Sequence, residues 1–162
     1  MKAVLVLAVA SIVLAPEMVT KAQAAPPNRV KVSYVPPKNP EHQAIYEQLK
    51  AVRFLERLQQ FLTPFRLPRA LLVKMEGCDG DANAFYEKNV ITVCYEYSQQ
   101  LWNAKPAKTT AGGVAPIDAV GGPLFDTCLH EFGHALFDML RVPVFGREED
   151  AADQVSAAGV TC

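Results

Sequence analysis

The sequence predicts an α+β fold, in which a small antiparallel or mixed sheet lies beside a helix that carries the candidate site. Two β-rich segments separated by turn residues, at 84–86 and 90–97, predict a hairpin. Apolar residues at helical spacing from Leu124 to Leu140 predict a long helix, and the motif His130-Glu131-Phe132-Gly133-His134 lies on it. A second helix is expected to start near Arg147 and to carry a carboxylate for the same site.

Two further strands are expected upstream of the hairpin. Residues 30–35 alternate between apolar and polar side chains within a proline-rich stretch, which predicts an extended lead-in or an edge strand. Residues 71–75 are a second, mainly apolar candidate. Residues 87–89 supply the turn of the hairpin. A β-sheet next to the motif helix follows from these segments.

A helix is also expected from Pro40 to about Thr63, where Pro64 stops it. Its apolar residues at helical spacing are Ile45, Leu49, Val52, Leu55, Phe61 and Leu62. His42, at the exposed start of this helix, is expected to be a solvated side chain rather than a ligand. Residues 98–104 predict a short helix, and residues 105–122 a flexible loop that could cover a cleft.

The HExxH motif suits a metal site because of its position on one helical face. Gly122-Pro123 gives a break and a residue suited to a first helical turn, so the helix is expected to begin there. His130 and His134 then lie about 40° apart around the axis, close enough to share one ion, with Glu131 at the shoulder of that face. A carboxylate there could take a proton from a zinc-bound water. The opposite face is apolar and can be buried: Phe125, Cys128, Phe132, Leu136 and Met139.

Hydrolytic zinc sites take three protein ligands, so a third is needed. On a helix that starts near Arg147, Glu149 and Asp153 share a face at i and i+4, whereas Glu148 and Asp150 point elsewhere. Glu149 is therefore predicted to be the third ligand. Asp153 is predicted to accept the other ring N–H of a ligating histidine. The competing interpretation is an acidic first turn favoured by the helix dipole.

The motif His130 to His134, followed by Glu149, Ala152 and Asp153, resembles the gluzincins, in particular the CAAX-protease and HtpX-like peptidases. The segment Asn83-Ala84-Phe85 resembles the one that opens the strand hairpin beside the active site in those families. With Cys78, Cys94-Tyr95-Glu96 and residues 147–154, the chain is more similar still to a family of secreted bacterial proteins described as metallopeptidases from their motifs. The likeness covers roughly Leu67 to the C-terminus.

The resemblance implies a zincin-like domain with one zinc ion on His130, His134 and Glu149. It implies Glu131 as the catalytic base and a peptide or protein substrate lying along the sheet edge. Such families continue beyond the third ligand and often supply a Tyr or His to the oxyanion; here only Tyr86 and Tyr95 are candidates, from the place of the hairpin. Whether the chain is truncated stays open.

Two other functions stay open beside the zinc peptidase. One is a zinc-binding but weakly active or inactive module of the cell envelope with the same fold. The other is a chance motif on a structural helix, without metal.

The N-terminus predicts export. A short positive region, an apolar run to Ala15 and the A-x-A site Ala22-Gln23-Ala24 indicate a signal peptide over residues 1–24, leaving one domain at 25–162. The run is shorter than the about 20 residues that cross a bilayer, so no stable membrane insertion is expected after cleavage, and the location is secreted or periplasmic. An uncleaved anchor is the alternative.

The charge gives no indication of a nucleic-acid partner, because the net charge is −1 and no basic patch with interleaved aromatics is present. The four cysteines form no C-x-x-C pair, and in an exported chain they favour disulfides over a thiolate metal site. Cys78 and Cys94 flank the Asn-Ala-Phe turn and are predicted to pair. A pairing of Cys128 with Cys162 stays open.

Overall fold

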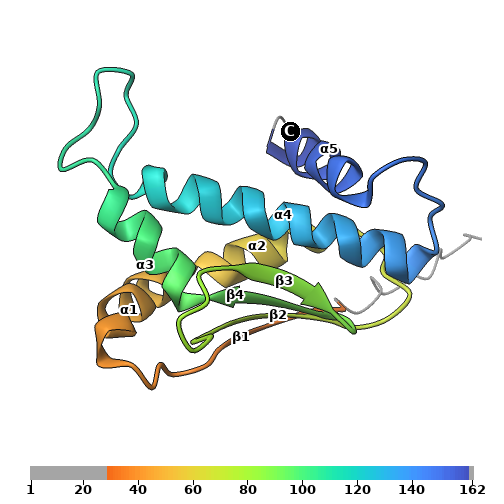
Figure 1. Ribbon diagram of the computed structural model, residues 1–162, viewed down its shortest axis with the longest axis horizontal. Coiled ribbons are helices and arrows are strands. Elements are labelled where there is room, and N and C mark those ends of the chain that lie inside the picture. The colour runs from red at the N-terminus through yellow and green to blue at the C-terminus, as the bar shows by residue number, and fades with distance from the viewer. Residues whose placement is uncertain (1–28, 161–162) are drawn as a thin grey trace, which may run out of the picture.

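The computed structural model describes residues 29–160, and its centre is a four-stranded sheet of order β1-β2-β4-β3 (Figure 1). The strands are β1 (Val30–Tyr34), β2 (Leu71–Glu76), β3 (Ala84–Glu87) and β4 (Val90–Cys94). β1, β2 and β4 run parallel, and β3 pairs antiparallel with β4 at the edge. The sheet is therefore mixed, and β1 and β3 are its two edge strands. The signal peptide expected at residues 1–24 lies outside the described residues.

The strand predictions are confirmed, with one end corrected. The hairpin β3–β4 turns at Lys88 and Asn89, both at positive φ. β4 ends at Cys94, not at Tyr97, because Tyr95 begins helix α3 (Tyr95–Ala104). Tyr95 is fully buried there against the ring of Tyr46, so packing rather than its β propensity decides its conformation.

The single helix expected from Pro40 to Thr63 is wrong. The chain forms a 3₁₀ turn (η1, Pro40–His42), α1 (Gln43–Ala51) and α2 (Phe54–Leu62), separated at Arg53, whose φ of 54° is left-handed. A straight helix of that length would extend about 35 Å, well beyond strands of about 17–20 Å. The break lets α2 pack on β1 while α1 packs on α3.

The expectation that His42 is solvated is also wrong. Its side chain is 6% exposed, and its ring lies 6.2 Å from that of Tyr95. Because η1 packs against the start of α3, the ring is enclosed between them.

The last two helices are α4 (Asp118–Leu140) and α5 (Glu148–Val160). α4 begins before Gly122-Pro123, so the expected break is wrong, and the preceding loop ends near Ile117. Pro123 lies inside the helix and supplies no N–H to it. Val120 and Leu124, on either side of Pro123, are completely buried, and this packing keeps the turn helical.

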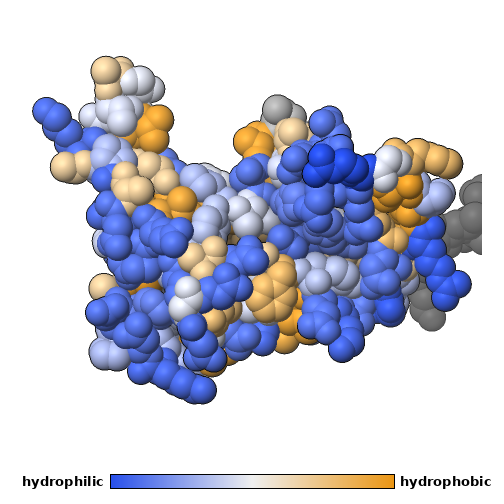
Figure 2. Space-filling model, in the orientation of Figure 1, coloured by the Kyte–Doolittle hydropathy of each residue, from blue (hydrophilic) through white to orange (hydrophobic). Residues whose placement is uncertain are grey.

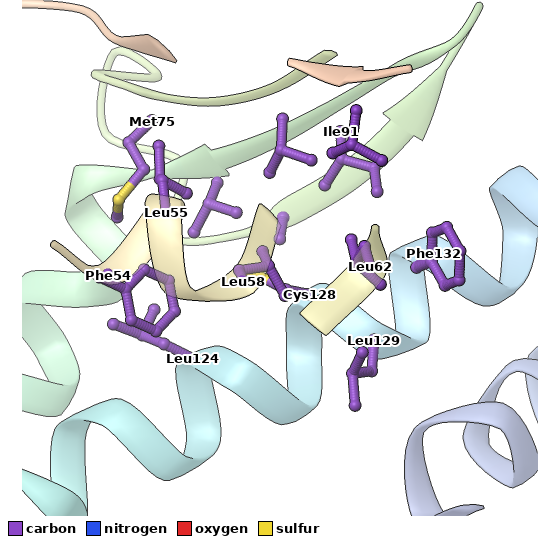
Figure 3. Close-up of a cluster of buried hydrophobic side chains, with 14 of the residues drawn as sticks. Phe54, Leu55, Leu58, Leu62, Met75, Ile91, Leu124, Cys128, Leu129 and Phe132 are labelled. Carbon is purple, nitrogen blue, oxygen red and sulfur yellow. The ribbon is translucent and has the colours of Figure 1, made fainter. Parts of the chain in front are cut away.

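The core lies between one face of the sheet and helices α2 and α4 (Figure 3). Leu71, Val73 and Met75 alternate inward along β2. On α4, the side expected to be apolar is buried at Cys128, Phe132 and Met139, and partly buried at Phe125 and Leu136. Helix α5 packs on the side of α4 away from the sheet (Figure 1), and the two histidines contact it there. None of the described helices has the length and apolar character needed to cross a membrane.

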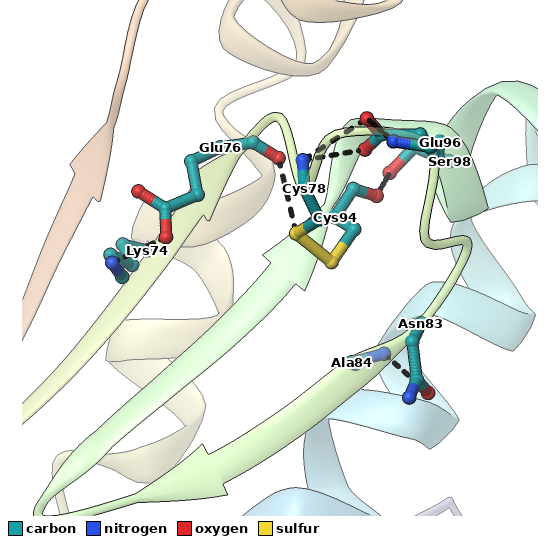
Figure 4. The surroundings of a disulfide bond; sticks show 9 residues. Lys74, Glu76, Cys78, Asn83, Ala84, Cys94, Glu96 and Ser98 are labelled. Carbon is teal, nitrogen blue, oxygen red and sulfur yellow. Dashed lines mark hydrogen bonds and ion pairs between the residues drawn. A yellow bond between two sulfur atoms is a disulfide. The ribbon is translucent and has the colours of Figure 1, made fainter.

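A disulfide joins Cys78, after β2, to Cys94 at the end of β4 (Figure 4), as predicted. The carboxylate of Glu96 accepts hydrogen bonds from the backbone N–H groups of Cys78 and Gly80. These bonds fix the segment that leads from β2 to the edge strand β3. Cys128 is a buried free thiol, and Cys162 lies outside the described residues.

Candidate metal centre

Helices α4 and α5 bring two imidazoles and one carboxylate together. The Nε2 atoms of His130 and His134 are 3.2 Å apart. Glu149 Oε2 lies 3.2 Å from the first and 3.6 Å from the second. Ligand atoms from these three side chains all lie within 4.8 Å of one another, so together they could hold a metal ion. The described residues contain one other such group, but two of its members are Cys78 and Cys94, which are joined in the disulfide.

The outer nitrogens of both histidines contact carboxylates of α5. Asp153 Oδ1 lies 2.8 Å from His130 Nδ1, in the position predicted for an acceptor of the histidine's other ring N–H. Glu148 Oε1 lies 2.7 Å from His134 Nδ1, so the expectation that Glu148 points elsewhere is wrong. Glu148 is the first residue of α5, and the crossing of α5 over α4 brings this end beside the second histidine. Nothing in the periodicity of α5 alone could show that crossing.

These contacts determine which nitrogens are free for an ion. An ionised carboxylate only accepts hydrogen bonds, so each Nδ1 donates its hydrogen. In a neutral imidazole the Nε2 then carries a lone pair. Two such lone pairs and the Glu149 carboxylate converge on one point, an arrangement that repels itself without a cation. The donor set therefore fits a bound metal ion.

Small residues hold α5 close to α4. Ala152 is completely buried in the contact between the two helices. One turn later, Ser156 donates to Asp126 Oδ1 at 2.6 Å. The site consequently depends on helix packing rather than on a loop.

A cleft of about 600 Å³ opens over the three side chains. Its lining residues are Asn83, Ala84, Phe85, Tyr86, His130, Glu131, His134, Glu148 and Glu149. The surface over α5 is mostly hydrophilic (Figure 2). One wall is β3, the edge strand, so the Asn-Ala-Phe segment lies beside the histidines as the resemblance implied.

Glu131 lies in this cleft and is only 8% exposed. Burial raises the pKa of its carboxyl group, against the opposing effects of the two imidazoles and of a hydrogen bond from the backbone N–H of Tyr86. The carboxylate is thus largely enclosed, with the backbone N–H of Tyr86 near it. Such a group is suited to accept a proton inside the cleft.

Neither tyrosine suggested for the oxyanion has an unengaged hydroxyl group. Tyr95 is fully buried, and its hydroxyl donates to the carbonyl of Val35 at 2.8 Å, which excludes it. Tyr86 lines the cleft, but its hydroxyl donates to Asp138 Oδ2 at 2.6 Å. The sequence analysis did not single out Asp138. The indication that the sequence offered is its position on α4, four residues after His134.

Comparison with known families agrees with this geometry. The profile of a family described as "Putative metallopeptidase" matches residues 34–161. The chain belongs to this metallopeptidase family. No curated protein and no solved structure matches it. The family's description suggests a hydrolase that would act on peptides, and the cluster of His130, His134 and Glu149 is compatible with a metal ion.

Proposed function

We propose that this protein is a zinc-dependent peptidase in which His130, His134 and Glu149 hold one zinc ion. The observation that carries the proposal is the convergence of two Nε2 atoms and one carboxylate, with both Nδ1 atoms bonded outward to Asp153 and Glu148. Two imidazoles and one glutamate form a donor set typical of catalytic zinc, which keeps a further position for water or substrate. Fixed Nδ1–H groups keep both rings in the orientation and tautomer that ligation needs.

In the proposed reaction, the groups that line the cleft have separate roles. Zinc, when bound, supplies a Lewis acid for the scissile carbonyl and for a water molecule. Glu131 accepts a proton from the attacking water and returns it to the leaving amine. The N–H of Tyr86 lies near this carboxylate, and both residues line the cleft. β3 is an edge strand of the described sheet and lines the cleft, so we expect an extended peptide to lie along it and recognition to depend mostly on the substrate backbone.

Glu131→Gln tests the proposal because it preserves shape and removes the base. We expect zinc content near wild type and hydrolysis of casein reduced about 10²–10⁴-fold. His130→Ala should lose zinc and activity together. Glu87→Gln, on the exposed end of β3 and paired with Lys88, is the matched control and should leave both unchanged. Full activity in Glu131→Gln would refute the mechanism.

The alternative, a zinc-binding envelope module with weak or no turnover, predicts a different result. Wild-type protein with full zinc occupancy would then hydrolyse nothing across a broad peptide library. A zinc stoichiometry near zero after mild purification would instead select the reading without metal.

We also propose that the protein is exported and that residues 1–24 are removed. The Cys78–Cys94 disulfide supports this, because such bonds persist in oxidising compartments. Mature protein isolated from the periplasm or the medium should begin at Ala25. A chain that keeps Met1 and sediments with membranes would contradict the proposal.

A further inference from the structure

One residue, Tyr86, meets helix α4 at two points. Its backbone N–H lies near the carboxylate of Glu131, whose pKa it acts to lower, and both residues line the cleft. Its hydroxyl donates to Asp138 Oδ2 at 2.6 Å. Glu131 and Asp138 are seven residues apart on α4, about 10 Å along the axis. The strand therefore lies against the helix over nearly two turns and is hydrogen-bonded to it at Asp138.

The second of these points is itself held in place. Asp138 Oδ2 also accepts a bond from Arg69 Nη2 at 3.0 Å. The hydroxyl oxygen of Tyr86 in turn accepts the N–H of Asn89, from the hairpin turn, at 3.3 Å. The Tyr86 hydroxyl is thus bonded to α4 and to the hairpin turn, and its acceptor Asp138 is bonded in turn to Arg69 from the segment before β2. Hydrogen bonds to a charged acceptor are about twice as strong as neutral ones.

The hydrogen bonds of the Tyr86 hydroxyl matter because β3 is an edge strand. Within the described sheet β3 pairs only with β4, so its distance from α4 is not set by a second neighbouring strand. The same strand and helix form facing parts of the cleft. A shift of β3 would move the Tyr86 N–H away from Glu131 and would change the strand edge along which a substrate is proposed to lie.

We propose that Asp138, supported by Arg69, is a positioning residue: by holding the Tyr86 hydroxyl it keeps β3, and with it the Tyr86 N–H, beside the Glu131 carboxylate in the cleft. The inference rests on the proposed peptidase function. Asp138 itself touches neither the proposed ligands nor the base through any bond described above. Replacing Asp138 should therefore lower the turnover rate and leave the zinc content unchanged.

The test compares Tyr86→Phe and Asp138→Ala with a matched control. Tyr97 is another tyrosine whose hydroxyl contacts α4, at Thr127 Oγ1 3.0 Å away, but it lies on α3 and not on β3. Tyr97→Phe therefore removes the same kind of bond without releasing the edge strand. Asp138→Asn keeps a carbonyl acceptor and should restore part of what Asp138→Ala loses.

Two measurements are made on the full chain. In the zinc-loaded enzyme, Tyr86→Phe and Asp138→Ala should lower kcat about 10- to 100-fold, with a smaller change in KM and unchanged zinc content. In the metal-free protein, hydrogen exchange of the amides at residues 84–87 should accelerate in both variants and stay at the wild-type rate in Tyr97→Phe.

The exchange measurement needs no turnover, so it separates the two hypotheses. An inactive wild-type protein would count against the peptidase, while faster exchange at 84–87 would still support the Tyr86–Asp138 restraint. Exchange at the wild-type rate in both variants would overturn the inference, even in an active enzyme. An equal loss of kcat in Tyr97→Phe would overturn it as well, because the effect would then not be specific to β3.

Discussion

Gly133 of α4 lies so close to Ala152 of α5 that a Cβ atom at position 133 would be 3.1 Å from Ala152 Cα and 3.3 Å from Val155 Cβ. The glycine is the fourth residue of the HExxH motif and lies between the proposed ligands. Its missing side chain lets α5 approach closely enough for Glu149 to reach the histidines. The packing of the two helices and the ligand set are thus linked at this contact.

Gly133→Ala should weaken zinc binding and destabilise the fold. Alanine gains about 1 kcal/mol of helix propensity, but overpacking against a helix backbone costs about 1–3 kcal/mol and would push α5 away. Zinc titration of metal-free protein and urea unfolding measure the two effects. Gly121→Ala is the control, since Gly121 lies in the same helix with nothing within 4 Å and does not precede Pro123, and it should stabilise the fold by up to about 1 kcal/mol. Wild-type zinc affinity in Gly133→Ala would show that α5 can move without affecting the site.

Replacing the acidic residues of α5 one at a time should rank them by their role. Glu149→Ala removes a proposed ligand and should cause the largest loss of zinc affinity. Glu148→Ala removes only the partner of His134 Nδ1 and should cost about 10–100-fold, as is typical of such partners.

Asp150→Ala is the control for this series, because Asp150 lies in the same turn but pairs only with Arg147, at 4.0 Å. Competition with a chromophoric zinc chelator gives the affinities. A loss in Glu148→Ala equal to or larger than that in Glu149→Ala would remove Glu149 from the ligand set.

The double substitution of Cys78 and Cys94 by Ser should lower the free energy of unfolding by about 3 kcal/mol. The bond closes a loop with a sequence separation of 16, and its loss mainly increases the entropy of the unfolded chain. Urea unfolding measures the change, and peptide mapping without reductant should show the linked peptides in the native protein. Native protein in which both thiols react with an alkylating agent would contradict the assignment.

Glu96 should contribute stability that is lost in acid. Partial burial acts to raise the pKa of Glu96, but backbone N–H donors, including those of Cys78 and Gly80, outweigh it and hold the pKa below its usual value. The folded state therefore favours the ionised form, and the contribution is present above the unfolded pKa of about 4.3 and disappears as the pH falls through the lower folded value.

Glu96→Gln should consequently reduce the difference in unfolding free energy between pH 7 and pH 3, measured in urea. Glu47→Gln, whose partner is the exposed Gln43, is the control and should leave that difference unchanged. An identical pH dependence in wild type and Glu96→Gln would contradict the assigned role.

The face of α4 that carries His130 and His134 could be predicted from the sequence, because the angular period of a helix is a property of one continuous segment. The same holds for the alternation in β1 and for the short hairpin of β3 and β4. Cys78 and Cys94 could be paired since they flank the Asn-Ala-Phe turn at residues 83–85. In each of these cases the relevant partners are close in sequence or share one element.

What only the tertiary structure decided depends on how separate elements cross. The pairing of Glu148 with His134 follows from the angle between α5 and α4, and the contact of Tyr86 with Asp138 joins residues 52 positions apart. The break at Arg53 and the burial of His42 arise because α1 and α2 must fit a short sheet and an adjacent α3. Periodicity describes which side of an element is apolar, whereas the distance and angle between two elements result from the packing of all side chains between them.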